Sequence, residues 1–224
     1  MTAKHRAAAA ALAYVKDGMT VGLGTGSTAQ IFIDLLGAEI VAGRLKDIRG
    51  IPTSVRSDHQ ARSLHIRIVD FSIAATCDIT IDGADEVADD LSLIKGLGGA
   101  LLREKLVAQN STRLVVIADA SKRVSRLGTK TALPVEVVRF SHHATERFLR
   151  TVGCTPVLRM STPAEPFVTD NGNFIYDCQF PGGITAPGDL DRTLRDRAGV
   201  VETGLFVGIA AEAIIGTESG VERL

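Results

Sequence analysis

The feature that most constrains this chain is the alternation, up to residue 118, of short apolar runs with stretches of helical periodicity. Each apolar run has four or five residues, which suits a strand buried on both faces. We expect strands at 20–23, 48–51, 66–69, 77–81 and 114–118, and helices at 4–16, 29–36, 55–63 and 99–110. Because strands joined by crossover helices run parallel, the pattern predicts an α/β fold with a mostly parallel sheet.

The character of the sequence changes near Gly128, beyond which prolines become frequent. A helix is expected at 142–151, and an Asn-Gly pair between two apolar runs predicts a hairpin at 170–173. We therefore expect a small α+β domain over 129–203. The segment 204–215 resumes a buried strand-and-helix pattern, so 204–224 is expected to return to the main domain formed by 1–128.

Charge and composition exclude several classes of protein. The chain has 25 Lys and Arg against 26 Asp and Glu without a basic cluster, so we expect no nucleic acid partner. No apolar run approaches the roughly 20 residues of a membrane span, and the alanines at 7–11 are too weakly hydrophobic for a signal peptide. The three cysteines form no CxxC pair, and the adjacent His142 and His143 cannot converge on one ion. We expect a cytoplasmic chain without disulfides or a protein-built metal site.

A glycine-rich stretch, GLGTGST at 22–28, follows the first expected strand and opens a helix. Glycines allow a ligand close to the backbone, and the helix start with Ser27 and Thr28 favours an anion such as phosphate. The stretch is not a Walker A sequence, since no Lys follows, and Ser27 replaces the third glycine of a dinucleotide fingerprint. By itself it is equally compatible with a tight structural turn.

Two further segments place polar groups at expected strand ends. Three carboxylates, Asp82, Asp85 and Glu86, crowd the end of one strand, where like charges are costly unless a ligand, cation or proton offsets them. The alternative is a solvated turn with an Asp cap. Lys95 precedes the glycine loop at 96–99, so it is either a functional cation at the same edge or an ordinary surface lysine.

Glu104 lies in the expected helix at 99–110, and the positions that share its helix face are apolar. Such surroundings favour the neutral carboxylic acid and suit a general base working near neutrality, unless the face is peripheral and Glu104 reaches water. Lys122 follows another buried strand and offers a point charge to phosphate or a surface charge at a helix start, with Asp119 as a cap.

These segments together resemble the A-type ribose-5-phosphate isomerases. The matching strings are GTGST at 24–28, DGADE at 82–86, KG at 95–96, REK at 103–105, ADASK at 118–122, LPVEV at 133–137, VTDNGN at 168–173 and GLF at 204–206. They occur in the expected order over almost the whole chain, which makes the set specific although each string alone is modest evidence.

The resemblance implies a Rossmann-like main domain, a small ferredoxin-like α+β domain and a homodimer or homotetramer. It implies reversible isomerisation of ribose 5-phosphate to ribulose 5-phosphate through a cis-enediolate, in the non-oxidative pentose phosphate pathway, without metal or cofactor. Glu104 would be the base, assisted catalytically by Asp82, Asp85 and Lys95. Substrate contacts would involve Thr25, Gly26, Ser27, Thr28, Gly83, Ala84, Gly96, Leu97, Gly98 and Lys122.

One position departs from the family, because many relatives have glycine where this chain has Leu97. If that position requires a positive φ, leucine strains the loop; otherwise the loop merely gains a side chain.

Two other classes of function share parts of this pattern. A nicotinamide-dependent dehydrogenase would need an acidic residue after the second strand, where the chain has Pro52, Thr53 and Ser54. A non-catalytic phosphosugar-sensing domain could share the sheet and glycine loop, but it has no need for Glu104 in an apolar stripe.

Overall fold

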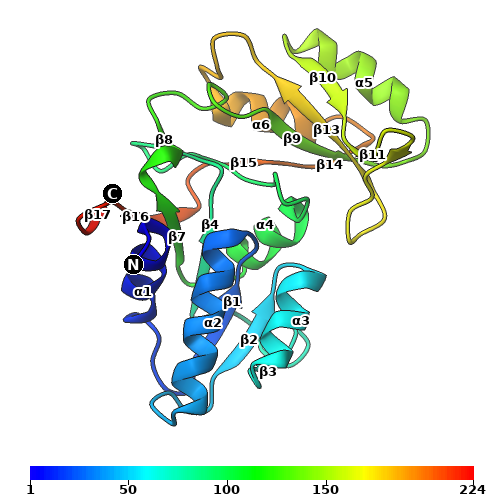
Figure 1. The fold of residues 1–224 in the computed structure, drawn as a ribbon. Helices are drawn as coiled ribbons and strands as arrows, with labels where there is room; N and C mark the ends of the chain where they lie inside the picture. Colours follow the sequence, from blue (N-terminus) through cyan, green and yellow to red (C-terminus); the bar gives the residue numbers. More distant parts are fainter. The chain divides into compact units, whose positions relative to one another are not determined.

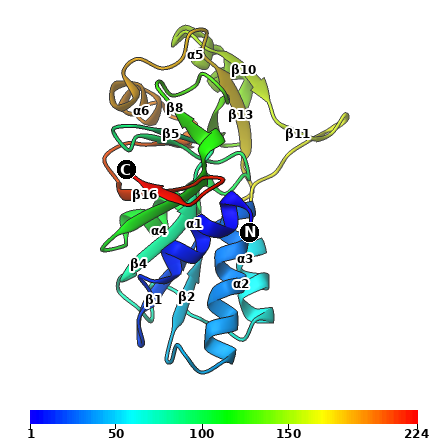
Figure 2. The ribbon, with the colours of Figure 1, turned by 60° about the vertical axis from the view of Figure 1, so that its left-hand side comes forward.

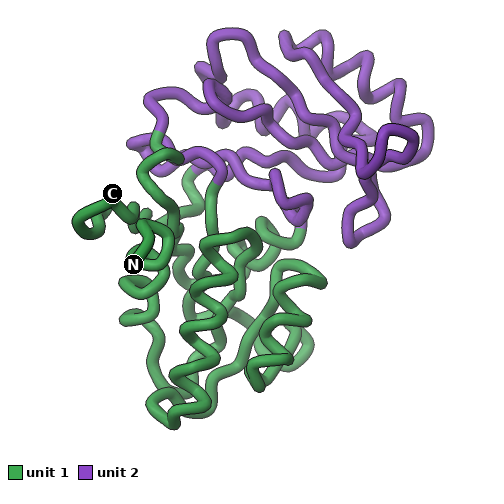
Figure 3. Tube along the Cα trace, in the orientation of Figure 1, with its two compact units in different colours: residues 1–84, 103–123, 208–224 green, residues 85–102, 124–207 purple.

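The chain folds into two compact units. The computed structural model describes residues 1–224 (Figure 1). Unit 1 comprises residues 1–84, 103–123 and 208–224, and unit 2 comprises residues 85–102 and 124–207 (Figure 3). No helix combines the length and the apolar character needed to cross a bilayer.

Unit 1 is built on a seven-stranded sheet in the order β17-β16-β7-β4-β1-β2-β3. The strands are β1 (Thr20–Leu23), β2 (Arg49–Pro52), β3 (Arg67–Ile68), β4 (Ile79–Gly83), β7 (Leu114–Asp119), β16 (Ala210–Gly216) and β17 (Val221–Arg223). Every neighbouring pair is parallel except β16 and β17. This confirms the predicted α/β fold, and the carboxyl ends of six strands meet at one edge.

Helices α1 (Ala3–Leu12) and α2 (Ser27–Val41) pack on one face of this sheet (Figures 1 and 2). Buried alanines let α1 approach the strands closely, while α2 contributes the larger side chains of Phe32 and Ile33 to the same core. Helix α3 (Val55–Ser63) follows β2, and Val107 of α4 (Leu101–Gln109) belongs to a separate cluster with Ile51 and Cys77. The predicted order of strands and helices is confirmed, with α1 ending four residues earlier than expected.

Unit 2 contains a four-stranded antiparallel sheet in the order β10-β13-β9-β14. Its elements along the chain are β9 (Leu133–Val137), α5 (His142–Thr151), β10 (Thr155–Leu158), β13 (Phe174–Gln179), α6 (Pro187–Arg195) and β14 (Val200–Thr203). This βαββαβ order with that strand arrangement is the ferredoxin-like fold, which confirms the expectation. Leu149 of α5 and Leu194 of α6 pack with alternate residues of β9 and β13 in one core.

A second, smaller sheet in the order β15-β6-β5-β8 adds to the structure. Its strands are β5 (Glu86–Ala88), β6 (Leu93–Ile94), β8 (Arg123–Val124) and β15 (Leu205–Phe206), and a 3-10 helix, η1 (Ala120–Lys122), precedes β8.

Two local predictions were wrong. The turn at 170–173 exists, with Thr169 N–H donating to the Asn173 carbonyl (2.9 Å), but it does not join two strands of one hairpin. The hairpin is formed earlier by β11 (Met160–Thr162) and β12 (Glu165–Pro166), which extend away from β13 (Figure 2). Residues 204–215 contain no helix, because their buried run continues the sheets as β15 and β16.

Glu86 organises the chain between β8 and β9. Its carboxylate is fully buried and accepts hydrogen bonds from the backbone amides of Gly128 (2.6 Å), Lys130 (2.7 Å) and Thr131 (2.6 Å). One buried side chain therefore accepts hydrogen bonds from three amides of the turn at 128–131.

We predict that Glu86→Gln lowers the free energy of unfolding by about 2–4 kcal/mol, because the amide replaces an acceptor with a donor facing a buried N–H. Urea denaturation measures the loss, and Glu165→Gln at an exposed position is the control. Equal stabilities of the two variants would contradict the structural role given to Glu86.

Candidate active site

The glycine loop after β1 is locked to the end of β4. A Cβ added to Gly24 would lie 2.2 Å from Asp82 Oδ1 and 2.5 Å from Asp82 Cα, so only glycine fits. The amides of Thr25 (2.9 Å) and Gly83 (2.7 Å) both donate to Asp82 Oδ1. Asp82 is 1% exposed, and two backbone amides thus hold its carboxylate at the sheet edge.

The Thr25 side chain fixes the same loop from its other side. Its hydroxyl lies 2.8 Å from Thr53 Oγ1 and 2.8 Å from Ser54 Oγ, both directly after β2. The amide and the hydroxyl of Thr25 thus both form hydrogen bonds within the protein. Thr25, which was predicted to contact the substrate, therefore helps to shape the loop. Gly26, with φ 108°, immediately precedes α2, and Ser27 and Thr28 lie in the helix's first turn.

One lysine contacts this helix start, and a second acts on the same carboxylate as the first. Lys4 Nζ donates to Ser27 Oγ (2.9 Å). Burial raises the pKa of Asp119, but hydrogen bonds from Ser121 and the charges of Lys4 and Lys122 outweigh it, so this pKa is lowered. Lys4 and Lys122 thus share an electrostatic environment with Asp119 at the carboxyl end of β7. Together with the positive end of α2, they suit a phosphate group.

Glu104 is buried on α4 in unit 1, with 4% of its surface exposed. The interpretation that it reaches bulk water is therefore excluded. A carboxylate shielded in this way exchanges protons with a bound ligand more readily than with solvent, which suits a general base.

In unit 2, Lys95 is also buried, with 2% exposure, so it is not an ordinary surface lysine. Its amide donates to the Gly204 carbonyl (2.9 Å), and its ammonium lies 5.4 Å from the centre of the Phe206 ring. Asp85 Oδ2 accepts the Leu97 amide (2.9 Å), and the Asp85 amide donates to the Ile94 carbonyl (2.8 Å). Asp85 and the loop that carries Lys95 (residues 95–99, the lysine loop) are thus held together within this unit.

The loop tolerates Leu97 without strain. Gly96 and Gly99 have positive φ values of 103° and 80°, whereas Leu97 is not among the residues with positive φ. Its side chain is 42% exposed, so the departure from the family merely adds a side chain to the loop.

The three carboxylates at 82–86 are bound by different parts of the chain. Backbone amides of different segments bind each of them: Asp82 at the β1 loop, Asp85 at Leu97, and Glu86 at the turn 128–131. These separate amides stabilise the three carboxylates, so it does not follow from the sequence that a ligand, cation or proton must offset them. The same structure assigns Glu86 to stability and leaves Asp82 and Asp85 as site candidates.

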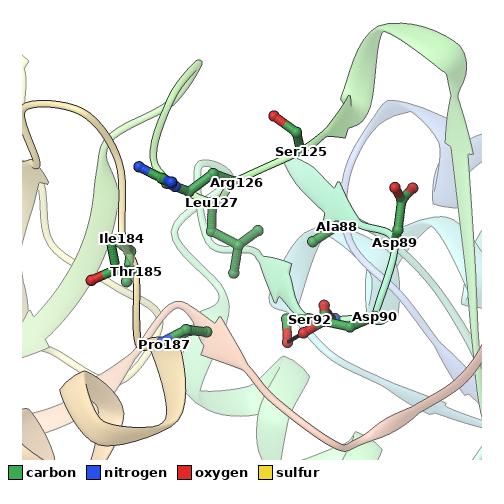
Figure 4. Close-up of a pocket in the computed structure, with 10 residues that line it drawn as sticks. All are labelled: Ala88, Asp89, Asp90, Ser92, Ser125, Arg126, Leu127, Ile184, Thr185 and Pro187. Carbon is green, nitrogen blue, oxygen red and sulfur yellow. Dashed lines mark hydrogen bonds between the residues drawn. The ribbon is translucent and has the colours of Figure 1, made fainter.

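A separate hollow of about 350 Å³ lies within unit 2 (Figure 4). Its lining includes Asp89, Asp90, Arg126, Ile184 and Thr185, and none of the predicted site residues contributes to it. The structure contains no group of three or more His, Cys, Asp or Glu side chains arranged to hold a metal ion.

Sequence reasoning missed Lys4, Thr53 and Ser54. Nothing in the alanine-rich first helix marks Lys4, since its contact with Ser27 depends on how α1 packs. The hydroxyls of Thr53 and Ser54, however, follow a strand end directly, and that position is a signal for a role at the sheet edge.

The chain is similar to known proteins over its whole length. Residues 49–220 match the family described as ribose 5-phosphate isomerase A (phosphoriboisomerase A). The chain is 47% identical to ribose-5-phosphate isomerase A of Bacillus mycoides, covering 100% of this chain and 99% of the relative. It is 50% identical to the Parvibaculum lavamentivorans protein of the same name, covering 98% and 96%.

Solved structures show the same similarity. A D-ribose-5-phosphate isomerase in complex with phospho-erythronic acid has a TM-score of 0.96 at 39% identity, covering 99% of this chain and 97% of that one. The Plasmodium falciparum ribose 5-phosphate isomerase has a TM-score of 0.94 at 38% identity, with the same coverage of both chains.

We predict that Gly24→Ala lowers the free energy of unfolding by about 1–3 kcal/mol, since the added methyl group must displace Asp82 or the loop. Urea denaturation measures the loss. Gly220→Ala is the control, because a Cβ there has no neighbour within 4 Å. A Gly24→Ala variant as stable as Gly220→Ala would show that the β1 loop is looser than described.

Proposed function

This chain belongs to the ribose 5-phosphate isomerase A family and is an aldose–ketose isomerase, and we propose that it interconverts D-ribose 5-phosphate and D-ribulose 5-phosphate with Glu104 as its base. The observation that carries the assignment of the base is the burial of Glu104, which is 4% exposed on α4. Proton transfer next to a sugar carbonyl needs such a group, protected from exchange with water.

In the proposed reaction, Glu104 removes the proton from C2 of the open-chain aldose, and the electron pair moves onto the carbonyl oxygen to give a cis-enediolate. A proton passes between the oxygens on C1 and C2, and Glu104 then returns its proton to C1 to form the ketose. The base is regenerated, the aldose has become its ketose isomer, and no electrons leave the sugar. Positioned acid–base catalysis of this kind contributes on the order of 10²–10⁴-fold.

Lys95 is proposed to stabilise the enediolate oxygen. Its burial supports this role, because an ammonium group held away from water interacts more strongly with a developing anion. Asp82 is proposed to assist ring opening and hydroxyl proton transfer, and Asp85 to orient the sugar. Backbone amides already fix both carboxylates, so neither has to be reorganised when the sugar binds.

The phosphate is proposed to bind at the start of α2, where Ser27 and Thr28 follow Gly26. Lys122 was expected there from the sequence, and we add Lys4 because it contacts Ser27 directly. The remaining expected contacts, Thr25, Gly83, Ala84, Gly96, Leu97 and Gly98, belong to the loops that adjoin these groups along the chain. Binding energy from the phosphate would position the reactive end of the sugar.

The two alternative functions are not supported. Thr53 and Ser54 occupy the end of β2 and bind Thr25, at the place where a dehydrogenase of this fold carries an acidic residue for the ribose. A sensor is not supported by the full-length similarity to isomerases.

We further propose that the enzyme works without metal or organic cofactor, because a carboxylate base and a lysine suffice for the proton transfers. The proposed setting is the cytoplasm, in the non-oxidative pentose phosphate pathway, with the chain assembled as a homodimer or homotetramer.

We predict that the purified chain forms ribulose 5-phosphate from ribose 5-phosphate at an undiminished rate after treatment with a chelator. Glu104→Gln should lower kcat by at least about 10²-fold, since the amide keeps the shape and removes the base. A coupled assay for ribulose 5-phosphate measures both, and the exposed Glu218→Gln is the control.

Loss of activity in the chelator would contradict the metal-free mechanism. Near-normal kcat of Glu104→Gln would eliminate Glu104 as the base while leaving the family assignment intact.

We predict that Lys4→Met and Lys122→Met each raise KM about tenfold, as expected for the loss of one charge-assisted contact to phosphate. Steady-state kinetics with ribose 5-phosphate measure the change, and the exposed Lys16→Met is the control. A wild-type KM for Lys4→Met would remove this lysine from the phosphate site.

A further inference from the structure

Within unit 2, the side chain of Arg159 is bound to the lysine loop (residues 95–99). Arg159 directly follows β10, and its Nη1 donates to the carbonyl oxygens of Gly96 (3.0 Å) and Leu97 (3.1 Å). A single cationic donor thus binds two consecutive carbonyls of the loop that carries Lys95. Neither the resemblance to a family nor the sequence pattern pointed to this arginine.

Asp177 on β13 holds the guanidinium in place. Its carboxylate accepts from Arg159 Nε (2.9 Å) and Nη2 (2.5 Å) in a two-point ion pair. The side chain of Arg159 is 13% exposed and that of Asp177 is 27% exposed, so solvent screens the pair only partly. The Arg159 backbone is bound as well, since its amide donates to the Ile175 carbonyl (2.8 Å).

The direction of these hydrogen bonds fixes the opposite side of the loop. The chain has no cis peptide bond, so each amide N–H points roughly away from the carbonyl of its own peptide group. With the carbonyls of Gly96 and Leu97 turned toward Arg159, the amides of Leu97 and Gly98 turn away from it. Consistently, the Leu97 amide donates to Asp85 Oδ2 (2.9 Å). The loop is therefore bound by a cation through its carbonyls and by a carboxylate through an amide.

The Phe167 ring packs against both the lysine loop and Arg159. A Cβ on Gly99 would lie 2.5 Å from Phe167 Cζ, so the Phe167 ring lies directly against the loop. The Arg159 guanidinium carbon is 5.8 Å from the centre of the same ring. The Gly99 amide also donates to the Gly96 carbonyl (2.9 Å), which closes the loop as a tight turn.

We propose that Arg159, held by Asp177, is a positioning residue that sets the lysine loop for stabilisation of the enediolate. The inference rests on the proposed function, since it gives the loop the oxyanion-stabilising task assigned to Lys95. Arg159 acts through the loop. Its guanidinium orients the Gly96–Leu97 and Leu97–Gly98 peptide groups and thereby fixes the positions of Asp85 and Lys95 relative to each other.

The consequence is a selective loss of transition-state stabilisation. Without Arg159 the two carbonyls lose their shared donor and the loop can rotate, although the phosphate site of unit 1 keeps all its groups. Misplacement of catalytic groups by about 1 Å costs on the order of 10²-fold in rate. We therefore expect kcat for ribose 5-phosphate to fall on the order of 10²-fold in Arg159→Met, with a much smaller change in KM.

The test compares four variants. Arg159→Met removes the donors at similar length, Arg159→Lys retains the charge, and Asp177→Asn retains the arginine but releases it. Arg150→Met is the matched control, because Arg150 also pairs with a carboxylate in unit 2, Glu146, but on the exposed face of α5. Circular dichroism and thermal unfolding establish that each variant is folded, and if Arg159→Met does not fold, Asp177→Asn and Arg159→Lys still carry the test.

Two inhibitors separate a positioning role from a merely structural one. Phospho-erythronic acid, the ligand named for one of the similar structures, carries a carboxylate that offers two oxygens as an enediolate does. Its inhibition constant should rise about tenfold or more in Arg159→Met, because the loop no longer meets those oxygens. Inorganic phosphate should compete as it does in the wild type. Arg159→Lys and Asp177→Asn should give smaller changes in the same direction.

Each outcome decides the proposal. Wild-type kcat in folded Arg159→Met and Asp177→Asn overturns it, as does an equal weakening of phospho-erythronic acid and inorganic phosphate. An inactive wild-type chain overturns the proposed function itself. An active wild type whose Arg159 variants keep its kcat and inhibition constants overturns only the positioning role.

Discussion

A carboxylate removed from water is stable in a fold only if hydrogen-bond donors replace the solvent, and this requirement organises the chain around residues 82–86. Backbone amides supply the donors: two for Asp82, one for Asp85 and three for Glu86. Because the donors come from three different loops and from the end of β4, satisfying the carboxylates also holds those loops in place. The glycine at position 24 follows from the same constraint, since any side chain there would meet Asp82.

Backbone amides therefore hold two of the candidate catalytic groups, Asp82 and Asp85. Amides of the main chain have no rotamers to change, so they stay in place when a ligand binds. Charged side chains also hold the lysine loop. The Arg159 guanidinium donates to two carbonyls of the loop, and Asp85 accepts from one of its amides. In both places a charged side chain immobilises peptide groups, which suits a reaction that needs preorganised dipoles.

The fold was predictable from the sequence where periodicity alone decides the structure. Runs such as 114–118 are apolar throughout, which a strand buried on both faces requires, and the intervening helices then force parallel connections. The segment 204–215 was misread because a short buried run does not distinguish a strand from a helix. The Asn-Gly turn was recognised, but the pairing of the strand that follows it was not. That strand, β13, pairs with β9 and β10 and not with the segment directly before the turn.

Apart from Glu104, which the apolar face of its helix marked, the site was predictable where its groups lie at or after strand ends. Asp82, Lys95 and Ser27 do so, and their neighbourhood of glycines marked them. Lys4 and Arg159 do not, because each reaches its target from a separate element through tertiary packing. Glu86 lies in the same acidic segment after a strand as Asp82, but its carboxylate stabilises the turn at 128–131. The order of acidic residues in the sequence does not show which of them faces a ligand.

The ordinary backbone conformation of Leu97 and its half-exposed side chain have a practical consequence. The three cysteines of the chain are all buried, so a thiol introduced at position 97 would be the sole one open to a bulky labelling reagent. A fluorophore attached there would sit between the anchored peptides of the lysine loop without competing for their hydrogen bonds. It would turn this loop into an optical reporter of ligand occupancy.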